Sequence, residues 1–231
     1  MITLLLATRN AHKIEEIRAI IGQAYAYLSL KDLPDAPEAI EDAGTFAGNA
    51  TKKSIALAKW TQHSIRHTQG LYVLADDSGL EVDALHGAPG VHSARFAALD
   101  SGQSGNSSDA QNREKLLRLL QDVPPGRRTA RFRCVLALTP VPEPQKQSTS
   151  PVCEADESEL ATELFEGACE GQIGFAPRGQ GGFGYDPLFV PDGYEQTFAE
   201  LGEEIKNEMS HRAQALAKLK QRFVRGLTHL S

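Results

Sequence analysis

The feature that most constrains the fold is a change of hydrophobic period within the first 22 residues. Residues 2–7 form an apolar run, which is typical of a buried strand. Residues 11–21 then carry isoleucine at one-turn spacing among charged residues, and this pattern indicates an amphipathic helix. Asn10 suits the N-cap of that helix and Gly22 suits its end. Strand, short polar turn and helix form the opening of an α/β unit, so we predict an α/β fold.

The rest of the chain alternates in the same way. The patterns predict helices at 45–60, 106–120 and 210–225, and strands at 71–75, 131–138, 162–173 and 188–190. Residues 80–95 are rich in glycine and proline and are expected to form turns. Residues 139–159 contain prolines and polar residues and are expected to form a mobile surface loop. The 231 residues fit one domain, or two lobes that share a cleft.

Charge and cysteine content narrow the functional class. The formal net charge of −6 argues against broad binding to DNA or to an anionic membrane, so an anionic ligand needs locally gathered positive charge. No apolar stretch approaches a membrane span, and the first residues are expected to form a strand and not a leader. Cys134, Cys153 and Cys169 have neither zinc spacing nor a disulfide pattern. A reducing cytoplasmic setting is the simplest expectation.

Polar segments lie where predicted elements begin or end, which is where α/β proteins place their sites. The first runs from Thr8 to Lys13, between the first strand and the first helix. A helix N-terminus attracts phosphate, and Lys13 adds a full positive charge. Asn10 is equally an ordinary cap and Lys13 an ordinary solvated lysine, so this segment alone leaves both roles open.

Two acidic pairs are candidates for a metal site. Glu41 and Asp42 precede the second predicted helix, where they either hold a metal or complement the helix dipole, and Lys53 lies further along that helix. Asp76 and Asp77 come at the end of a predicted buried strand, where carboxylates are costly unless they are solvated, paired or bound to a metal. Magnesium prefers such oxygen ligands. Asp-Asp-Ser-Gly is also ordinary turn chemistry, so the second pair stays open as well.

A glycine-rich segment and the start of the last helix complete the set. Residues 179–187 read GQGGFGYDP, in which Phe183 is placed to stack on a base and Asp186 to accept hydrogen bonds from one. The alternative is a glycine-rich hairpin whose phenylalanine enters the core. Lys206 and Arg212 suit a phosphate clamp, while His211 suits either a base carbonyl or a structural role.

The order and wording of these segments resemble one known family. ATRNAHK, EDAGTFAGNATKKS, ADDSGLEVDALHGAPGVHSAR, GGFGYDPLF and SHRAQAL occur in sequence between about residues 2 and 219. Together they resemble the inosine/xanthosine triphosphate pyrophosphatases, the Ham1-like proteins. The resemblance implies an elongated α/β fold with a central mixed sheet flanked by helices, two lobes and a nucleotide cleft between them. It also implies a homodimer, a magnesium requirement, and hydrolysis of the purine nucleotides ITP, dITP and XTP to monophosphate and pyrophosphate.

The resemblance also implies roles for individual residues. Asp77 would act as the general base, and Glu41 and Asp77 would lie at the magnesium. Ser78 would bond the nucleotide, and His211 and Arg212 would recognise the 6-oxo group of its base. Lys53 and Lys206 would neutralise phosphate. The triphosphate would contact Thr8, Arg9, Asn10, Ala11, His12 and Lys13, and the base would be surrounded by Phe183, Gly184, Tyr185 and Asp186.

The chain departs from the family pattern at three places. Arg9 stands where the family usually has glycine, at the phosphate turn. Ala43 stands where glycine is usual, with Gly44 one position later, which leaves open whether Glu41 or Asp42 meets the metal. Gly48 replaces a usual glutamate. Two other functions remain in view: a nucleotide sensor without turnover, and a pyrophosphatase for modified pyrimidine or methylated nucleotides, as in the Maf-like proteins.

Overall fold

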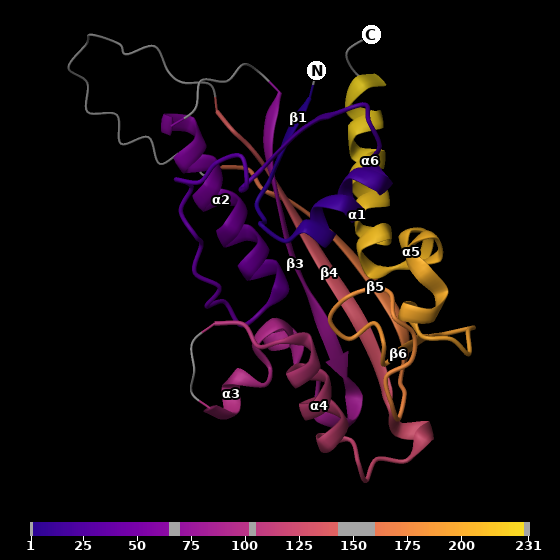
Figure 1. Cartoon of the computed structure of the whole chain (residues 1–231). Helices are drawn as coiled ribbons and strands as arrows, with labels where there is room; N and C mark the ends of the chain where they lie inside the picture. The colour runs from indigo at the N-terminus through magenta and orange to yellow at the C-terminus, as the bar shows by residue number, and fades with distance from the viewer. Residues whose placement is uncertain (1, 65–69, 102–104, 143–159, 229–231) are drawn as a thin grey trace, which may run out of the picture. The chain divides into compact units, whose positions relative to one another are not determined.

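A computed structural model describes residues 2–64, 70–101, 105–142 and 160–228 (Figure 1). The chain divides into two compact units, each contributed by two stretches of sequence. Unit 1 comprises residues 1–76 and 136–164, and unit 2 comprises residues 77–135 and 165–231. The long strands β3 (Leu71–Val82) and β4 (Thr129–Pro140) contribute residues to both units.

The remaining strands and helices follow the order of the sequence. Unit 1 contains β1 (Thr3–Leu6), α1 (Ala11–Ile21), β2 (Ala26–Ser29) and α2 (Phe46–Ser64). Unit 2 contains α3 (Ala98–Ser101), α4 (Asp109–Leu119), most of β5 (Glu163–Ile173), β6 (Phe189–Pro191), α5 (Phe198–Met209) and α6 (His211–Thr228). Short 3₁₀ helices at Asp83–Leu85, Gly90–Arg95 and Pro125–Arg127 also belong to unit 2.

The six strands form one mixed sheet in the order β2-β1-β3-β4-β5-β6. Strand β1 pairs in parallel with β2 and β3, so that Leu5 lies opposite Leu28 on one side and Val73 on the other. Strand β6 pairs antiparallel with β5. The parallel β1–α1–β2 start is the α/β unit expected from the change of period, and the predicted α/β class with a mixed sheet and flanking helices is confirmed.

Unit 1 is organised around the predicted first strand and helix. The Asn10 side chain accepts a hydrogen bond from the Lys13 amide, and Gly22 ends the helix with a φ of 89°, which favours glycine. Both predicted boundaries of α1 are therefore confirmed. The apolar core of this unit comes from β1, the segment after β2, α2, β3 and the segment after β4: Leu5, Ala36, Leu57, Ala58, Leu71, Val73 and Val141.

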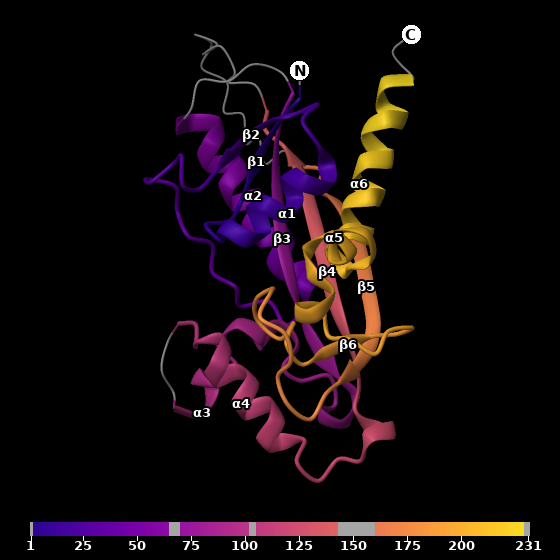
Figure 2. The same cartoon turned by 45° about the vertical axis from the view of Figure 1, so that its right-hand side comes forward.

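Unit 2 has a separate core that is richer in aromatic side chains. The ring of Phe132 lies 4.7 Å from that of Phe189 and 6.1 Å from that of Phe198, measured between centroids. Helix α5 lies beside α6 in both views (Figures 1 and 2). Cys169 is part of this core, and burial raises the pKa of its thiol to about 12, so it is no nucleophile at neutral pH.

Several predicted boundaries are wrong. The strand expected to end at Asp76-Asp77 continues to Val82, so these aspartates and Ser78 are strand residues and not a turn. A strand can carry Asp76 because the Lys13 ammonium pairs with its carboxylate. The second helix ends at Ser64 and not at residue 60, and β2, α3 and α5 were not predicted.

The predicted mobile loop at 139–159 is only partly within the described residues. Thr139 and Pro140 are the last residues of β4, and 143–159 lie outside the described part of the chain. Among the helices that the structure describes, none combines the length and the apolar character needed to cross a membrane.

Candidate functional site

The turn between β1 and α1 is held by its own side chains. The Thr8 hydroxyl accepts a hydrogen bond from the Asn10 amide at 3.1 Å, and the Asn10 side chain accepts one from the Lys13 amide at 3.3 Å. These bonds fix the first turn of α1, whose early N–H groups are a natural anion site. The Lys13 ammonium donates to the Asp76 carboxylate, so the turn is tied to β3 within unit 1.

Lys53 links three segments of unit 1. Its ammonium donates to the Glu41 carboxylate at 3.0 Å and to the backbone carbonyl of Asp76 at 2.7 Å. Helix α2 carries Lys53, and the buried Asn49 of the same helix accepts a hydrogen bond from the Ala43 amide at 3.0 Å. That bond holds the segment before α2 against the helix. We call Lys13, Glu41, Lys53 and Asp76 the cation cluster.

The two acids that precede α2 have different surroundings. Asp42 pairs with Lys52, both side chains are more than half exposed, and the Lys52 ammonium holds the pKa of the Asp42 carboxyl below its usual range. Glu41 instead shares Lys53 with Asp76. Neither acid lies in the first turn of α2. Each of them instead forms an ion pair with a lysine of that helix. Of the two, Glu41 belongs to the cation cluster.

The departures from the family pattern have local explanations. The Arg9 guanidinium donates to the Leu30 carbonyl at 3.2 Å and lies 3.7 Å from the Glu38 carboxylate, so it braces the segment that follows β2. A Cβ at Gly48 would lie 2.7 Å from the Ala43 Cβ, which is closer than such atoms approach. Ala43 therefore occupies the space that a side chain at position 48 would need.

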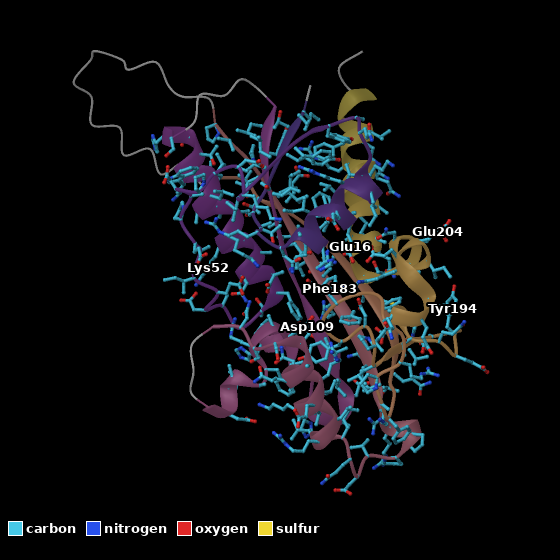
Figure 3. All side chains as sticks on the ribbon, in the orientation of Figure 1. Glu16, Lys52, Asp109, Phe183, Tyr194 and Glu204 are labelled. Atoms are coloured by element: carbon cyan, nitrogen blue, oxygen red, sulfur yellow. The ribbon has the colours of Figure 1, made fainter. Side chains whose placement is uncertain are left out.

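In unit 2, the glycine-rich segment is closed around one carboxylate. Asp186 accepts hydrogen bonds at the same oxygen from the Phe183 amide at 2.9 Å and from the Lys206 ammonium at 2.7 Å. The Lys206 ammonium also lies 4.3 Å from the centre of the Phe183 ring, a cation–π distance. Gly182 has a φ of 73°, and a Cβ there would lie 2.4 Å from the Asp186 oxygen, so the turn needs glycine. We call Phe183, which is labelled in Figure 3, together with Asp186 and Lys206 the loop cluster.

The start of α6 brings in the remaining predicted residues of unit 2. Ser210 caps the helix by accepting from the Ala213 amide at 3.2 Å. The Arg212 guanidinium, which is almost fully buried, donates to the Ser78 hydroxyl at 3.0 Å. The His211 ring stacks on Phe132 with 4.9 Å between centroids and 12° between planes. Ser78 and Arg212, 134 positions apart, are therefore brought together.

Sequence reasoning missed the role of Ser93. The Ser93 hydroxyl accepts from the Leu80 amide at 2.9 Å and donates to the Gly90 carbonyl at 2.6 Å, and its own carbonyl accepts from the Tyr185 hydroxyl at 2.9 Å. Burial, with a smaller contribution from the charge of Asp109, raises the pKa of Tyr185. Ser93 thus ties β3 to the glycine-rich segment. Its place in the quoted GAPGVHSAR block was the available sequence clue.

The oxygen atoms of this region fit a magnesium ion that arrives with phosphate. Asp76 and Asp77 are consecutive residues of β3, each at most 6% exposed, and Glu41 shares Lys53 with the first of them. Among the described residues, no three side chains of histidine, cysteine, aspartate or glutamate gather as a ready metal cage. Magnesium needs no such cage, because it is commonly held by one or two carboxylates together with substrate phosphates and water.

Comparison with known proteins gives a consistent picture. A family model described as the Ham1 family matches residues 4–222. Curated relatives named dITP/XTP pyrophosphatase include one from Opitutus terrae, 44% identical with 93% of this chain and 95% of the relative covered. Another, from Geobacter sulfurreducens, is 46% identical with 95% and 96% covered. The solved structure of the Staphylococcus aureus Ham1 protein matches with a TM-score of 0.74 at 33% identity, covering 97% of this chain and 98% of that one.

Proposed function

Since the chain belongs to the Ham1 family, we propose that it is a hydrolase that converts ITP, dITP and XTP to the monophosphate and pyrophosphate. The structural observation that carries the proposal is the convergence of Lys13 and Lys53 on Asp76, the first in the turn before α1 and the second inside α2. A triphosphate carries about four negative charges, and a chain of net charge −6 must supply positive charge locally to bind it.

The cation cluster is suited to phosphate. Thr8 and Asn10 order the N-terminal turn of α1, where Arg9, Ala11 and His12 are also proposed to contact phosphate oxygens. Lys13 and Lys53 add full positive charges that phosphate can share with the carboxylates. Lys206, to which the family resemblance gives a phosphate role, belongs to the loop cluster, where its ammonium donates to Asp186.

Glu41 and Asp77 are the proposed holders of magnesium. When bound, the ion would polarise the α-phosphate and lower the pKa of a water molecule. Asp77 would accept the proton of the attacking water. The oxygen of that water forms a bond to the α-phosphorus, and the bond from this phosphorus to the bridging oxygen breaks. The products are a nucleoside monophosphate and pyrophosphate.

The loop cluster and the start of α6 are suited to a purine. Phe183 offers a ring face for stacking, which is worth roughly 1–3 kcal/mol per base. Gly184, Tyr185 and Asp186 shape the backbone around that ring. Ser78 would bond the nucleotide. His211 and Arg212 would donate to the 6-oxo group of inosine or xanthine, and a 6-amino group would instead set donor against donor. We therefore expect ITP to be preferred over ATP.

Two further expectations rest on the family resemblance. We propose that the protein acts as a homodimer in the cytoplasm, where it would remove deaminated purine nucleotides from the pool. Analytical ultracentrifugation at micromolar concentration tests the first expectation, and a sedimentation coefficient of a 25.1 kDa monomer would contradict it.

The decisive experiment is a panel of nucleoside triphosphates with magnesium, scored for pyrophosphate against phosphate. We expect pyrophosphate release from ITP, dITP and XTP, and a specificity constant for ATP at least about 100-fold lower. The Asp77→Asn variant should keep its fold and lose about 10²–10⁴-fold in turnover, because it cannot accept the proton. Wild-type rates in that variant would remove Asp77 from the mechanism.

The same panel separates the alternatives. A sensor would bind ITP with magnesium and release no pyrophosphate. A pyrophosphatase of the Maf-like kind would instead prefer modified pyrimidine or methylated nucleotides. Comparable specificity constants for ATP and ITP would contradict the proposed recognition of the 6-oxo group.

A further inference from the structure

Two side chains of α4 form hydrogen bonds with the backbone of Gly184, one at its amide and one at its carbonyl. The Asp109 carboxylate accepts a hydrogen bond from the Gly184 amide at 2.8 Å, and the Arg113 guanidinium donates to the Gly184 carbonyl at 2.7 Å. Asp109 and Arg113 are four residues apart, so they project from the same face of the helix. Asp109 and Phe183 carry labels in Figure 3, where the two lie near each other. We call this arrangement the α4 clamp.

The clamp acts on a residue that needs it. Gly184 has a φ of 60° and no side chain, and a Cβ there would meet nothing within 4 Å. Packing therefore does not fix this residue. Its amide and its carbonyl are instead both bonded to charged side chains, which form stronger hydrogen bonds than neutral ones.

Phe183 thus lies between two anchors. On its N-terminal side, its own amide donates to Asp186 at 2.9 Å. On its C-terminal side, the next residue is held by α4. The two anchors restrain the backbone on either side of Phe183, and the backbone torsions limit the rotamers that its ring can adopt.

Helix α4 is itself firmly attached to unit 2. Ser108 and Gln111 form a capping box at its start. Asn112, which is 3% exposed, accepts from the Ala97 amide and donates to the Ala94 carbonyl. The Lys115 ammonium donates to the Phe96 carbonyl at 2.7 Å and lies over the Phe96 ring. Because α4 is fixed in this way, Asp109 and Arg113 can hold Gly184 in one position.

We propose that Asp109 and Arg113 are positioning residues for substrate binding, which set the pose of Phe183 through Gly184. This inference rests on the proposed function, because it takes Phe183 as the ring that stacks on the base. Neither side chain is assigned a contact with phosphate, metal or attacking water. Loss of the clamp is therefore expected to raise KM and to leave kcat nearly unchanged.

The first test measures the loop without any substrate. Amide hydrogen exchange, followed by mass spectrometry on peptides that cover residues 182–186, is compared between the wild type, Asp109→Ala and Arg113→Met. We expect the Gly184 amide to exchange about tenfold faster in Asp109→Ala and also faster in Arg113→Met, because local opening requires fewer broken bonds. The matched control is Arg118→Met, the same substitution on an exposed arginine of the same helix that pairs with Asp100. The control should exchange like the wild type.

The second test is kinetic. With ITP and with XTP, KM should rise about tenfold in Arg113→Met and in Asp109→Ala, with kcat within about twofold of the wild type. Both substrates should be affected equally, since a stacked ring is tolerant of the base's substituents. Arg113→Lys keeps a donor and should recover part of the loss.

The outcomes separate the clamp from the proposed function. Exchange that is unchanged in both variants overturns the clamp, whatever the substrate. Faster exchange with an unaltered KM overturns the positioning role, as does a fall in kcat of the same size as the change in kcat/KM. If the wild type releases no pyrophosphate from any purine nucleotide, the proposed function fails, and with it the recognition role, while the exchange data still decide whether α4 holds the loop.

Discussion

The cation cluster of unit 1 and the loop cluster of unit 2 each contain a lysine–carboxylate pair, but the two pairs have different surroundings. In the loop cluster, the side chains of Lys206 and Asp186 are both 3% exposed. In the cation cluster, the Lys53 side chain is 11% exposed and its partner Glu41 is 36% exposed. Exposure changes what a pair is worth, because the energy of an ion pair depends on how much water can replace either partner.

Exposure decides whether an ion pair in this protein can serve ligand binding or only stability. A charge at the surface can exchange its partner for a phosphate at little cost, since water solvates the carboxylate that is left behind. A buried charge cannot, because its partner would remain uncompensated in a medium of low dielectric constant. Within the cation cluster, the Lys53–Glu41 pair is thus suited to exchange partners with an anionic ligand, whereas the pair of the loop cluster is suited to keep one geometry.

The largest expected effect is on stability, from breaking the buried pair. Lys206→Met leaves the Asp186 carboxylate buried without its ammonium and is expected to lower the free energy of unfolding by about 3–5 kcal/mol. The same change at Lys53 leaves Glu41 partly exposed and removes the donor to the Asp76 carbonyl, and it should cost only about 1–2 kcal/mol. Urea denaturation of the two variants against the wild type measures both values.

Activity should rank the same two variants in the opposite order. Relative to the stability that each variant loses, Lys53→Met should lose more activity than Lys206→Met. Lys53→Met is expected to reduce pyrophosphate release strongly at saturating magnesium, although it remains as folded as the wild type. Equal destabilisation by the two substitutions would show that burial does not distinguish the clusters, and the comparison would fail.

Part of the cation cluster was predictable, because Lys13 lies in the first turn of α1. Asn10 and Lys13 follow from the change of period after the first strand, and their mutual hydrogen bond is the expected cap. The choice between Glu41 and Asp42 was not predictable. It depends on which of two adjacent lysines of α2 each acid meets, and that is a matter of helix phase in three dimensions.

The loop cluster was predictable only as a list of residues. GGFGYDP indicated a turn that approaches a ligand. The neighbouring sequence did not indicate that Asp186 would accept hydrogen bonds from both Phe183 and Lys206. The role of α4 was missed entirely, since Arg113 lies 71 positions from Gly184 and a lone arginine on a helix carries no pattern. Strand β3 was cut short for a related reason, because the partner that permits Asp76 in a strand is 63 positions away.

A substitution at Gly167 tests how tightly β5 packs against the start of α6 in unit 2. A Cβ at Gly167 of β5 would lie 2.1 Å from the His211 carbonyl and 2.8 Å from the Ala215 amide, both backbone atoms of α6. Gly167→Ala should therefore push the start of α6 away from β5 and cost about 1–3 kcal/mol of stability. A shift there also disturbs Arg212 and its bond to Ser78, so KM for ITP should rise.

The matched control for that variant is Gly174→Ala, where the added Cβ would meet its nearest backbone atom at an ordinary 3.5 Å. We expect this control to unfold and bind like the wild type to within about 0.5 kcal/mol. If Gly167→Ala behaves like its control, β5 and α6 can move apart at little cost. Unit 2 would then be less rigid around the start of α6 than we infer.

The smallest effect is expected near Glu41 of the cation cluster, at Ala43, which precedes α2, and at Gly48, which lies within it. Gly48→Ala places a Cβ 2.7 Å from that of Ala43 and 3.0 Å from the Thr45 hydroxyl, which accepts from the Gly48 amide. The helix gain of up to about 1 kcal/mol for alanine over glycine is then offset by crowding. In an Ala43→Gly background the main clash is absent, so the same substitution should stabilise.

A double-mutant cycle in urea measures this coupling, for which we expect about 0.5–1 kcal/mol. Because Ala43 lies two residues from Glu41, crowding at position 48 is expected to displace the segment that carries this acid, whereas the Asn49 bond to the Ala43 amide resists the shift. Additive effects of the two substitutions would mean that the segment moves freely. The segment that carries Glu41 would then be able to shift its backbone as well as exchange its ion-pair partner. The cation cluster would differ from the loop cluster more than we propose.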